Sequence, residues 1–370
     1  MKKTTMDISS FKYSLKNIPI PSENAYKKCF IDKLESLIRR MRWKVFHFEN
    51  PGKREVKETY GFKTPNAPPQ SEFLKPFENS LYDMFCNLEF NRSPTQFQKQ
   101  LSADAKQINS SHNLFVPADK TNNLYSVSKE NYSKLLTENI SKSYKKTDST
   151  CLSEINREAK QIASYLDIDD RAQILANRQA YLTLKDHKPN FPQNPKCRLI
   201  NPAKSEIGIP SKKMIDNINK QIRTKSKLNQ FQNTSDVIQW FRNIKQKPKS
   251  SFLKFDIEEF YPSITKDLLV KALDYAKTFV QIEEKTIEVI LHSRKSLLFE
   301  GKNIWIKKEN QHFDVTMGSY DGAEVCELIG LYLLHQLEKT FGHNIFGLYR
   351  DDGIGCLTNL PAPQVDKIRK

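Results

Sequence analysis

The chain has 370 residues and a formal net charge of +16, from 59 Lys and Arg against 43 Asp and Glu. This length is sufficient for a sizeable hydrophobic core and for more than one lobe. No apolar run approaches the roughly 18 residues that a membrane-spanning helix needs, and the first seven residues lack the apolar core of a signal peptide. These features predict no membrane-spanning helix and no signal peptide, and the basic excess is typical of proteins that hold phosphate backbones.

The six cysteines are scattered along the chain without a C-x-x-C pair. Neither a zinc site nor a disulfide framework is therefore predicted. We expect an intracellular protein with reduced thiols, located in the nucleus or the cytoplasm. The sequence leaves the oligomeric state open.

Residues 1–110 are predicted to form a basic, largely helical region with a linker. A helix is expected over residues 31–45, where Arg39, Arg40 and Arg42 surround Trp43. Such cations can hold a nucleic-acid backbone while the indole stacks on a base. A solvated helix face with one buried tryptophan explains the pattern equally well.

A basic hairpin and a basic helix are expected in residues 111–245. Residues 181–189 and 196–202 predict two strands, with Lys185, Lys188 and Arg198 near the ends of the connecting loop. Arginine offers phosphate a planar fork and lysine a compact charge. The helix expected over residues 211–227 has one apolar and one charged face. Its Lys212 and Lys213 face either a nucleic-acid duplex or solvent.

Two carboxylate-bearing segments dominate the last third of the chain. Asp256 ends an apolar, strand-like run, and a helix with Thr265 as its N-cap is expected to follow. Asp351 and Asp352 lie at the tip of a predicted hairpin. Adjacent carboxylates repel each other and need a compensating cation, and Mg²⁺ prefers oxygen ligands. An ordinary Asp-Gly turn is the alternative for the second segment.

Three segments, in this order, resemble the conserved motifs of reverse transcriptases. Residues 255–264 (Phe-Asp-Ile-Glu-Glu-Phe-Tyr-Pro-Ser-Ile) resemble motif A, residues 315–324 resemble motif B, and residues 349–352 (Tyr-Arg-Asp-Asp) resemble motif C. The similarity extends from about residue 114 to the end. The Ala-Asp-Lys element at residues 118–120 resembles the start of the fingers in some eukaryotic retroelement reverse transcriptases, the Penelope-like group among them. For the chain as a whole, a non-LTR element is the alternative type.

The resemblance implies an α+β fold with the parts of a right-hand polymerase. Residues 246–370 would form the palm, an antiparallel sheet with packed helices, and residues 111–245 a fingers-like subdomain. Few residues follow motif C, so the helical thumb is expected to be missing and the chain to be truncated. Motif B also departs from the usual pattern, because Met317 stands where Gln or Ser usually precedes the glycine.

The resemblance also implies a site. Asp256, Asp351 and Asp352 would be catalytic ligands of two Mg²⁺ ions, with Mn²⁺ as an alternative ion. Lys185 and Arg198 would bind the triphosphate of the incoming nucleotide; Lys188 competes with Lys185 for that role. The remaining nucleotide contacts would come from Tyr261, which blocks a ribose 2′-hydroxyl, and from Gly318, where the backbone approaches the nucleotide.

The implied activity is RNA-directed DNA synthesis by a retrotransposon-like element. Its partners would be an RNA template, a DNA primer and dNTPs. Two alternatives remain open. One is a truncated, non-catalytic protein that binds nucleic acid. The other is an RNA-dependent RNA polymerase, which would usually carry a smaller polar residue in place of Tyr261.

Overall fold

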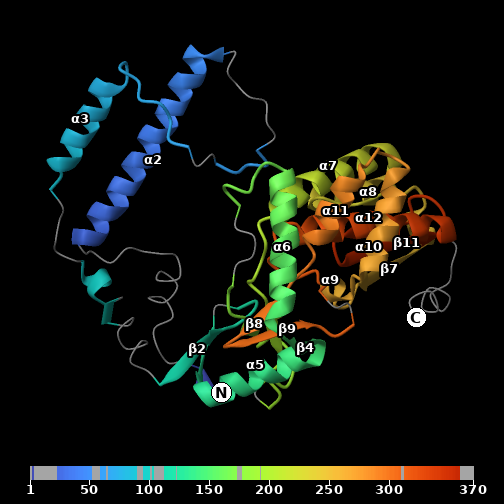
Figure 1. Cartoon of the computed structure of the whole chain (residues 1–370). Coiled ribbons are helices and arrows are strands. Elements are labelled where there is room, and N and C mark those ends of the chain that lie inside the picture. Colours follow the sequence, from blue (N-terminus) through green and yellow to red (C-terminus); the bar gives the residue numbers. More distant parts are fainter. Residues whose placement is uncertain are drawn as a thin grey trace. The chain divides into compact units, whose positions relative to one another are not determined.

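The computed structural model describes residues 2–3, 23–51, 59–63, 66–89, 95–100, 102–103, 112–121, 123–172, 177–191, 193–309 and 312–358 (Figure 1). The chain divides into two compact units. The first comprises Met1–Thr59, Lys63–Glu138 and Leu182–Arg198, and the second comprises Tyr60–Phe62, Asn139–Tyr181 and Leu199–Lys370. These limits differ from the predicted ones, because residues 199–245 join the second unit.

Among its described residues, the first unit contains the helices α2 and α3, most of α5, short helical stretches at residues 96–100 and 102–103, and two small sheets. The strands β1, β3 and β2 form an antiparallel sheet in that order, and β5 pairs with β6. The elements are β1 (Lys2–Lys3), α2 (Glu23–Glu49), α3 (Lys75–Cys86), β2 (Asn113–Pro117), β3 (Leu124–Ser128), α5 (Lys129–Ser143), β5 (Tyr181–Leu184) and β6 (Cys197–Ile200).

Asp186 fastens the β5–β6 hairpin to the β2–β3 hairpin. Its carboxylate accepts hydrogen bonds from Thr121 Oγ1 and Asn123 Nδ2, both at 2.7 Å, and from the Tyr125 hydroxyl at 3.0 Å. Burial opposes the charge, but these three donors outweigh it and lower the pKa of Asp186. The carboxylate therefore stays ionised and holds the two hairpins in one arrangement.

The second unit contains most of the helices and two three-stranded antiparallel sheets, ordered β10-β11-β7 and β4-β9-β8. The elements are β4 (Tyr144–Thr147), α6 (Ser149–Tyr165), α7 (Gly208–Ser226), α8 (Thr234–Asn243), η2 (Lys247–Lys249), β7 (Ser250–Asp256), α9 (Phe260–Ser263), α10 (Lys266–Lys277), α11 (Glu284–His292), β8 (Leu298–Glu300), β9 (Asn303–Lys307), α12 (Gly322–Phe341), β10 (Phe346–Tyr349) and β11 (Asp352–Thr358).

Side-chain caps set the starts of several helices in this unit, and those of α10 and α8 are two examples. The Thr265 hydroxyl accepts a hydrogen bond from the Leu268 N–H at 3.1 Å, so the predicted N-cap of α10 is confirmed. At α8, Asn233 and Asp236 form a capping box, in which each side chain accepts from the other's backbone N–H. Both caps satisfy donors that the first helical turn leaves unpaired.

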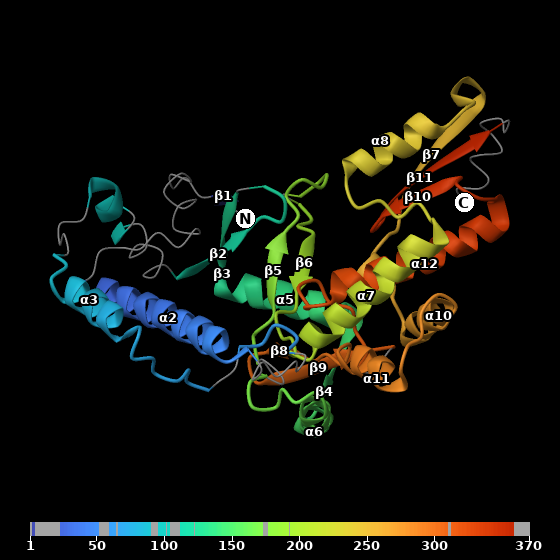
Figure 2. The ribbon, with the colours of Figure 1, turned by 90° about the horizontal axis from the view of Figure 1, so that it is seen from above.

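Helices cover both faces of the β10-β11-β7 sheet (Figure 2). Leu253 of β7 and Leu357 of β11 pack into the main core beneath α10 and α12. On the other face, Cys356 packs against Trp240 of α8. Alternate residues of a strand point to opposite faces, so this division follows directly from the period of two along β7 and β11.

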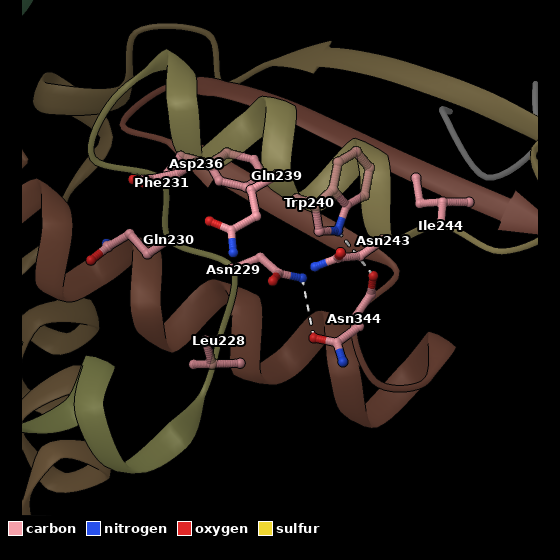
Figure 3. A pocket seen from close by; sticks show the side chains of 10 residues that line it. All are labelled: Leu228, Asn229, Gln230, Phe231, Asp236, Gln239, Trp240, Asn243, Ile244 and Asn344. Atoms are coloured by element: carbon pink, nitrogen blue, oxygen red, sulfur yellow. Dashed lines mark hydrogen bonds between the residues drawn. The ribbon is translucent and has the colours of Figure 1, made fainter.

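The segment 229–231 extends this sheet at its β10 edge. The Phe231 N–H donates to the Leu348 carbonyl at 2.8 Å, and the Leu348 N–H donates to the Asn229 carbonyl at 3.1 Å. Between this segment and α8 lies a cavity of about 440 Å³ (Figure 3). Its lining is rich in amides, among them Gln239 and Asn243 of α8, and contains no lysine or arginine.

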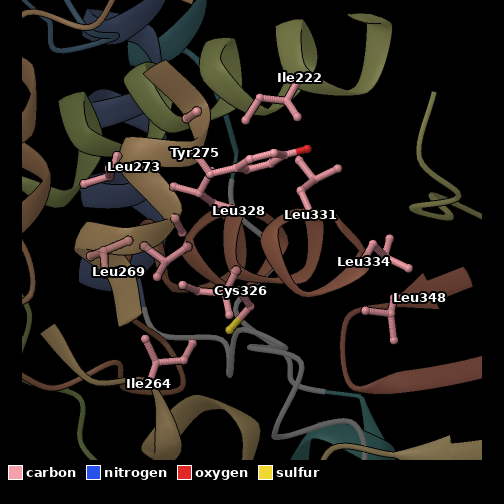
Figure 4. Close-up of a cluster of buried hydrophobic side chains, with 14 of the residues drawn as sticks. Ile222, Ile264, Leu269, Leu273, Tyr275, Cys326, Leu328, Leu331, Leu334 and Leu348 are labelled. Atoms are coloured by element: carbon pink, nitrogen blue, oxygen red, sulfur yellow. The ribbon is translucent and has the colours of Figure 1, made fainter. Parts of the chain in front are cut away.

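The core of the second unit explains why residues 199–245 belong there. Ile215, Ile218 and Ile222 of α7 pack with Leu328 and Leu331 of α12 in a single buried cluster. Figure 4 labels Ile222, Leu328 and Leu331 in part of this cluster. These side chains are buried or nearly so. Because α7 supplies one wall of this core, it belongs to the same compact unit as α12.

A buried ion pair joins three segments of this unit. Arg294 and Asp321 are 1% and 0% exposed, and the guanidinium donates directly to the Asp321 carboxylate. Asp321 also accepts from the hydroxyls of Ser211 at 2.5 Å and Ser293 at 2.7 Å, while Arg294 donates to Ser319 Oγ at 3.2 Å. Burial lowers the pKa of Arg294 only to about 10, so its guanidinium stays charged at neutral pH.

No helix in the described part of the chain is long and apolar enough to cross a lipid bilayer.

We predict that Arg294→Met destabilises the protein by about 3–5 kcal/mol, because it leaves the Asp321 carboxylate buried without its counter-charge. Urea-induced unfolding followed by circular dichroism measures the change. Asp321→Asn in the same chain removes that charge and is expected to restore part of the loss. If the free energy of unfolding of Arg294→Met alone lay within about 1 kcal/mol of the parent's, a stabilising role for the pair would be contradicted.

Candidate functional site

The sheet brings the three predicted carboxylates to one end. Asp256 is the last residue of β7, and Asp352, the first residue of β11, is its direct partner in the antiparallel register. Asp351 lies in the two-residue turn between β10 and β11, next to Asp352. All three side chains are exposed. We call this end of the sheet the carboxylate edge.

The hydrogen-bond pattern makes Asp256 and Asp352 a close pair. The Ile257 N–H donates to the Asp351 carbonyl at 2.9 Å. These two residues each lie one position beyond the Asp256–Asp352 pair, Ile257 after β7 and Asp351 before β11. The two aspartates are therefore a non-hydrogen-bonded pair, the class in which opposed side chains approach most closely. Directly opposed residues also point to the same face, so the two carboxylates share one side of the sheet.

Two strained backbone positions flank the carboxylate edge. Arg350, in the turn before Asp351, has a φ of +56°, and Glu259, three residues after Asp256, has a φ of +48°. Residues other than glycine rarely occupy this left-handed region, and each such residue costs on the order of 1–3 kcal/mol. Strain of this kind gathers at functional sites, where the surrounding structure holds a side chain in a required position.

Gly353, next to the carboxylate edge, leaves room for the ring of its cross-strand neighbour Phe255. It lies opposite Phe255, and a Cβ at this position would come within 2.2 Å of the Phe255 ring. Any larger residue would have to displace this ring. The glycine after the two aspartates is therefore required by the packing of its cross-strand neighbour.

Tyr261 lies between the carboxylate edge and α12. Its ring would be 3.5 Å from a Cβ placed on Gly322, at the start of α12. Burial raises the pKa of Tyr261 to about 12, with a smaller contribution from Cys326, while the charges of Arg350 and Asp351 also reach the phenol. The phenol is therefore neutral at physiological pH and offers a fixed, half-buried ring beside the aspartates.

The loop of residues 315–321, which we call the Gly318 loop, is held by the buried ion pair. Gly318 has a φ of +97°, and nothing lies within 4 Å of where its Cβ would be. The glycine is thus required by the backbone turn and not by crowding. Asp321 ends the loop, and its pairing with Arg294 fixes the loop before α12 begins. No sequence pattern indicates a role for Arg294, since a single arginine after a helix matches no motif.

The donor atoms at the carboxylate edge suit a hard divalent cation, since Mg²⁺ prefers carboxylate oxygens. Within the described residues, however, no group of three or more His, Cys, Asp or Glu side chains converges tightly enough to form a ready metal site. The chemistry of the side chains therefore fits Mg²⁺, and the side chains would have to turn toward a shared ion.

Lys185 and Arg198 lie in the first unit, on the β5–β6 hairpin. The Arg198 guanidinium forms an ion pair with Asp119 at 3.2 Å, and that carboxylate is nearly buried. Lys185 is half-buried, and its backbone N–H closes the hairpin onto the Lys196 carbonyl at 2.8 Å. Arg198 therefore already holds together two segments of its own unit.

Most residues of the basic cluster on α2 contact other residues of the first unit. Arg42 donates through both its Nε and a terminal nitrogen to Glu78 of α3, and Arg39 donates to the Asn66 carbonyl at 2.8 Å. Trp43 stacks on His47, with ring centroids 5.5 Å apart. Of the four predicted residues, Arg40 remains exposed. Arg42 is therefore paired with a carboxylate of α3, and its contact with a nucleic-acid backbone stays a prediction.

Lys212 and Lys213 on α7 also have neighbours within their unit. Lys212 forms an ion pair with Glu324 of α12 at 2.9 Å, and this hydrogen bond raises its pKa. The Lys213 ammonium lies 6.0 Å from the centroid of the Tyr60 ring. Lys212 is exposed, and its ion pair joins α7 to α12.

Similarity to known proteins is found by comparing structures and not by comparing sequences. No protein-family model matches the chain, and no curated protein matches its sequence. By structure, the chain is similar to the telomerase of Candida albicans in complex with a TWJ fragment of telomeric RNA. The TM-score is 0.50 at 12% identity over 81% of this chain and 50% of that chain.

Two further structures resemble the chain more weakly. The apo telomerase of Candida tropicalis, truncated from its C-terminal domain, gives a TM-score of 0.46 at 13% identity, over 92% of this chain and 79% of that chain. The RNA-dependent RNA polymerase of a human picobirnavirus gives 0.40 at 11% identity, over 83% and 67%. The chain spans about half the length of the Candida albicans telomerase, and its similarity to that protein indicates a polymerase-like fold.

Proposed function

We propose that this protein is a template-directed nucleotidyltransferase that extends a DNA primer with dNTPs along an RNA template. The observation that carries the proposal is the antiparallel register of β7 and β11, which sets Asp256 opposite Asp352 with Asp351 in the adjoining turn. A polymerase-like fold and a strongly basic chain support it. A retrotransposon-like origin agrees with the motifs in the sequence and remains part of the proposal.

In this proposal the carboxylate edge holds the reacting ends of primer and nucleotide. Asp256, Asp351 and Asp352 would bind two Mg²⁺ ions, which, when bound, activate the primer 3′-hydroxyl and neutralise charge on the triphosphate. The protein contributes mainly position and charge, as in other phosphoryl transfers. The strained turns at Arg350 and Glu259 would hold the aspartates in place before substrate arrives.

Tyr261 and the Gly318 loop would form the sides of the nucleotide site. Because Tyr261 is packed against the start of α12, its ring cannot easily withdraw, and a 2′-hydroxyl next to it would clash. The open space around Gly318 would admit the backbone close to a base or sugar. Lys185 and Arg198 would contact the triphosphate only if Arg198 exchanged Asp119 for phosphate oxygens.

We predict that Asp256→Asn and Asp351→Asn each lower primer extension by at least about 100-fold, since each removes a charge needed where the triphosphate reacts. The measurement is incorporation of dNTPs on an RNA template annealed to a DNA primer. Chelation of divalent ions is expected to stop the reaction of the parent protein.

Glu258→Gln is the matched control, because it makes the same chemical change two residues after Asp256, at another exposed carboxylate. This variant should extend the primer about as well as the parent. Equal activity of the Asp351→Asn variant and the parent would refute the assignment. Oligonucleotide binding without any extension by the parent would instead indicate a non-catalytic nucleic-acid-binding protein.

We predict that Tyr261→Ala lowers the preference for dNTPs over NTPs by at least about tenfold, since the ring would no longer exclude a 2′-hydroxyl. Competition between the two nucleotide types in the same extension assay measures this ratio. Tyr261→Phe keeps the ring and should keep the preference. A parent protein that prefers NTPs would indicate an RNA polymerase, and an unchanged ratio in Tyr261→Ala would remove Tyr261 from the site.

A further inference from the structure

A row of side chains leads away from the carboxylate edge along β7. Asp256, Lys254 and Phe252 are alternate residues of this strand, so they share the face of the sheet that α8 partly covers. All three are exposed. The row spans four residues, or roughly 13 Å at about 3.3 Å per residue. One face of the sheet thus changes from carboxylate to cation to aromatic ring.

The far end of this row is an exposed apolar patch. Phe252 lies against Phe241 of α8, with ring centroids 5.5 Å apart and an interplanar angle of 40°. Each of these phenylalanines is 42% exposed, and Ile238, one turn earlier on α8, is 46% exposed. We call Ile238, Phe241 and Phe252 the aromatic platform. Adjoining exposed apolar side chains of this kind mark a binding surface more often than isolated ones do.

The segment that carries the platform is basic throughout. Between Asp236 and Asp256 the sequence contains no acidic residue but five cations: Arg242, Lys245, Lys247, Lys249 and Lys254. Lys247 closes the end of α8 by donating to the Arg242 and Ile244 carbonyls, and its ammonium lies 5.2 Å from the Phe241 ring centroid. The other four are exposed, and none of them pairs with a carboxylate in the described part of the chain.

We propose that the aromatic platform binds a single strand of nucleic acid, with bases stacked on Phe241 and Phe252 and phosphates near Lys254 and the neighbouring cations. Aromatic faces beside unpaired cations are the combination by which proteins hold single strands without reading their sequence. A duplex would offer its phosphates but not its base faces. The direction of the strand, toward the carboxylate edge, rests on the proposed function.

The test is the binding of a fluorescein-labelled oligo-dT of about 12 nucleotides, within the range of single-strand site sizes, followed by fluorescence anisotropy. The same oligonucleotide with abasic sites is the second probe. The double variant Phe241→Ala/Phe252→Ala is expected to bind oligo-dT at least about fivefold more weakly. It should bind the abasic strand as the parent does, because that strand has no bases to stack.

Tyr165→Ala is the matched control, since Tyr165 is an exposed ring elsewhere in the second unit, with the Lys285 ammonium 3.9 Å from its centroid. This variant should bind both probes as the parent does. Lys254→Gln should lower the slope of log affinity against log salt by about 0.7, as expected for one lost phosphate contact to a single strand.

The variant Phe241→Leu/Phe252→Leu separates a loss of base stacking from a loss of folded structure, because it keeps the apolar contact and removes only the aromatic faces. It should also lose oligo-dT affinity while its thermal unfolding matches the parent. Unchanged oligo-dT binding in this variant would overturn the proposal. Equal loss for oligo-dT and the abasic strand would overturn it too, and altered self-association with unchanged oligonucleotide binding would identify the patch as a protein–protein contact.

The binding assay is run without divalent ions or dNTPs, and also in the Asp351→Asn variant. Platform-dependent binding in a protein that never extends a primer would leave this inference standing and refute the proposed activity. Primer extension by the parent protein, together with unchanged oligo-dT binding by its platform variants, would support the proposed activity and refute this inference. The two proposals can therefore fail separately.

Discussion

The antiparallel register of β7 against β11 is the constraint on which the candidate site depends. A slip of one residue would turn every side chain of β7 to the other face and move Asp256 away from Asp352. Two features hold the register: Leu253 and Leu357 are buried in the main core, and the Phe255 ring covers Gly353. The hydrophobic core and the carboxylate edge are thus set by the same alternation along one strand.

The buried pair of Arg294 and Asp321 fixes the second side of the site. A buried ion pair contributes little net stability over an apolar pair, but it tolerates few alternative arrangements, because separating the charges in the interior is costly. Here the pair also satisfies the hydroxyls of Ser211, Ser293 and Ser319. It therefore joins α7, the end of α11 and the Gly318 loop, and it sets where α12 begins beside Tyr261.

The positively charged side chains fall into two groups, those that pair with carboxylates of the protein and those that have no such partner among the described residues. Arg42, Arg198 and Lys212, each predicted to meet phosphate, form ion pairs with Glu78, Asp119 and Glu324. The cations between Asp236 and Asp256, to which the sequence pattern gave no role, have no carboxylate partner in the described residues. Net charge indicates that a polyanion is a suitable partner, but the pairing of each cation decides where that partner can bind.

From the sequence alone, the order of the three motifs, the strand ending at Asp256, the hairpin at Asp351 and Asp352 and the N-cap at Thr265 could be predicted. These features depend on neighbours in the chain, which turn residues and alternation specify. The membership of α7 in the second unit, the partner of each cation, the Arg294–Asp321 pair and the exposure of Phe241 beside Phe252 emerged only in the tertiary structure. Each depends on side chains far apart in sequence, whose meeting is decided by how the core packs and not by any local pattern.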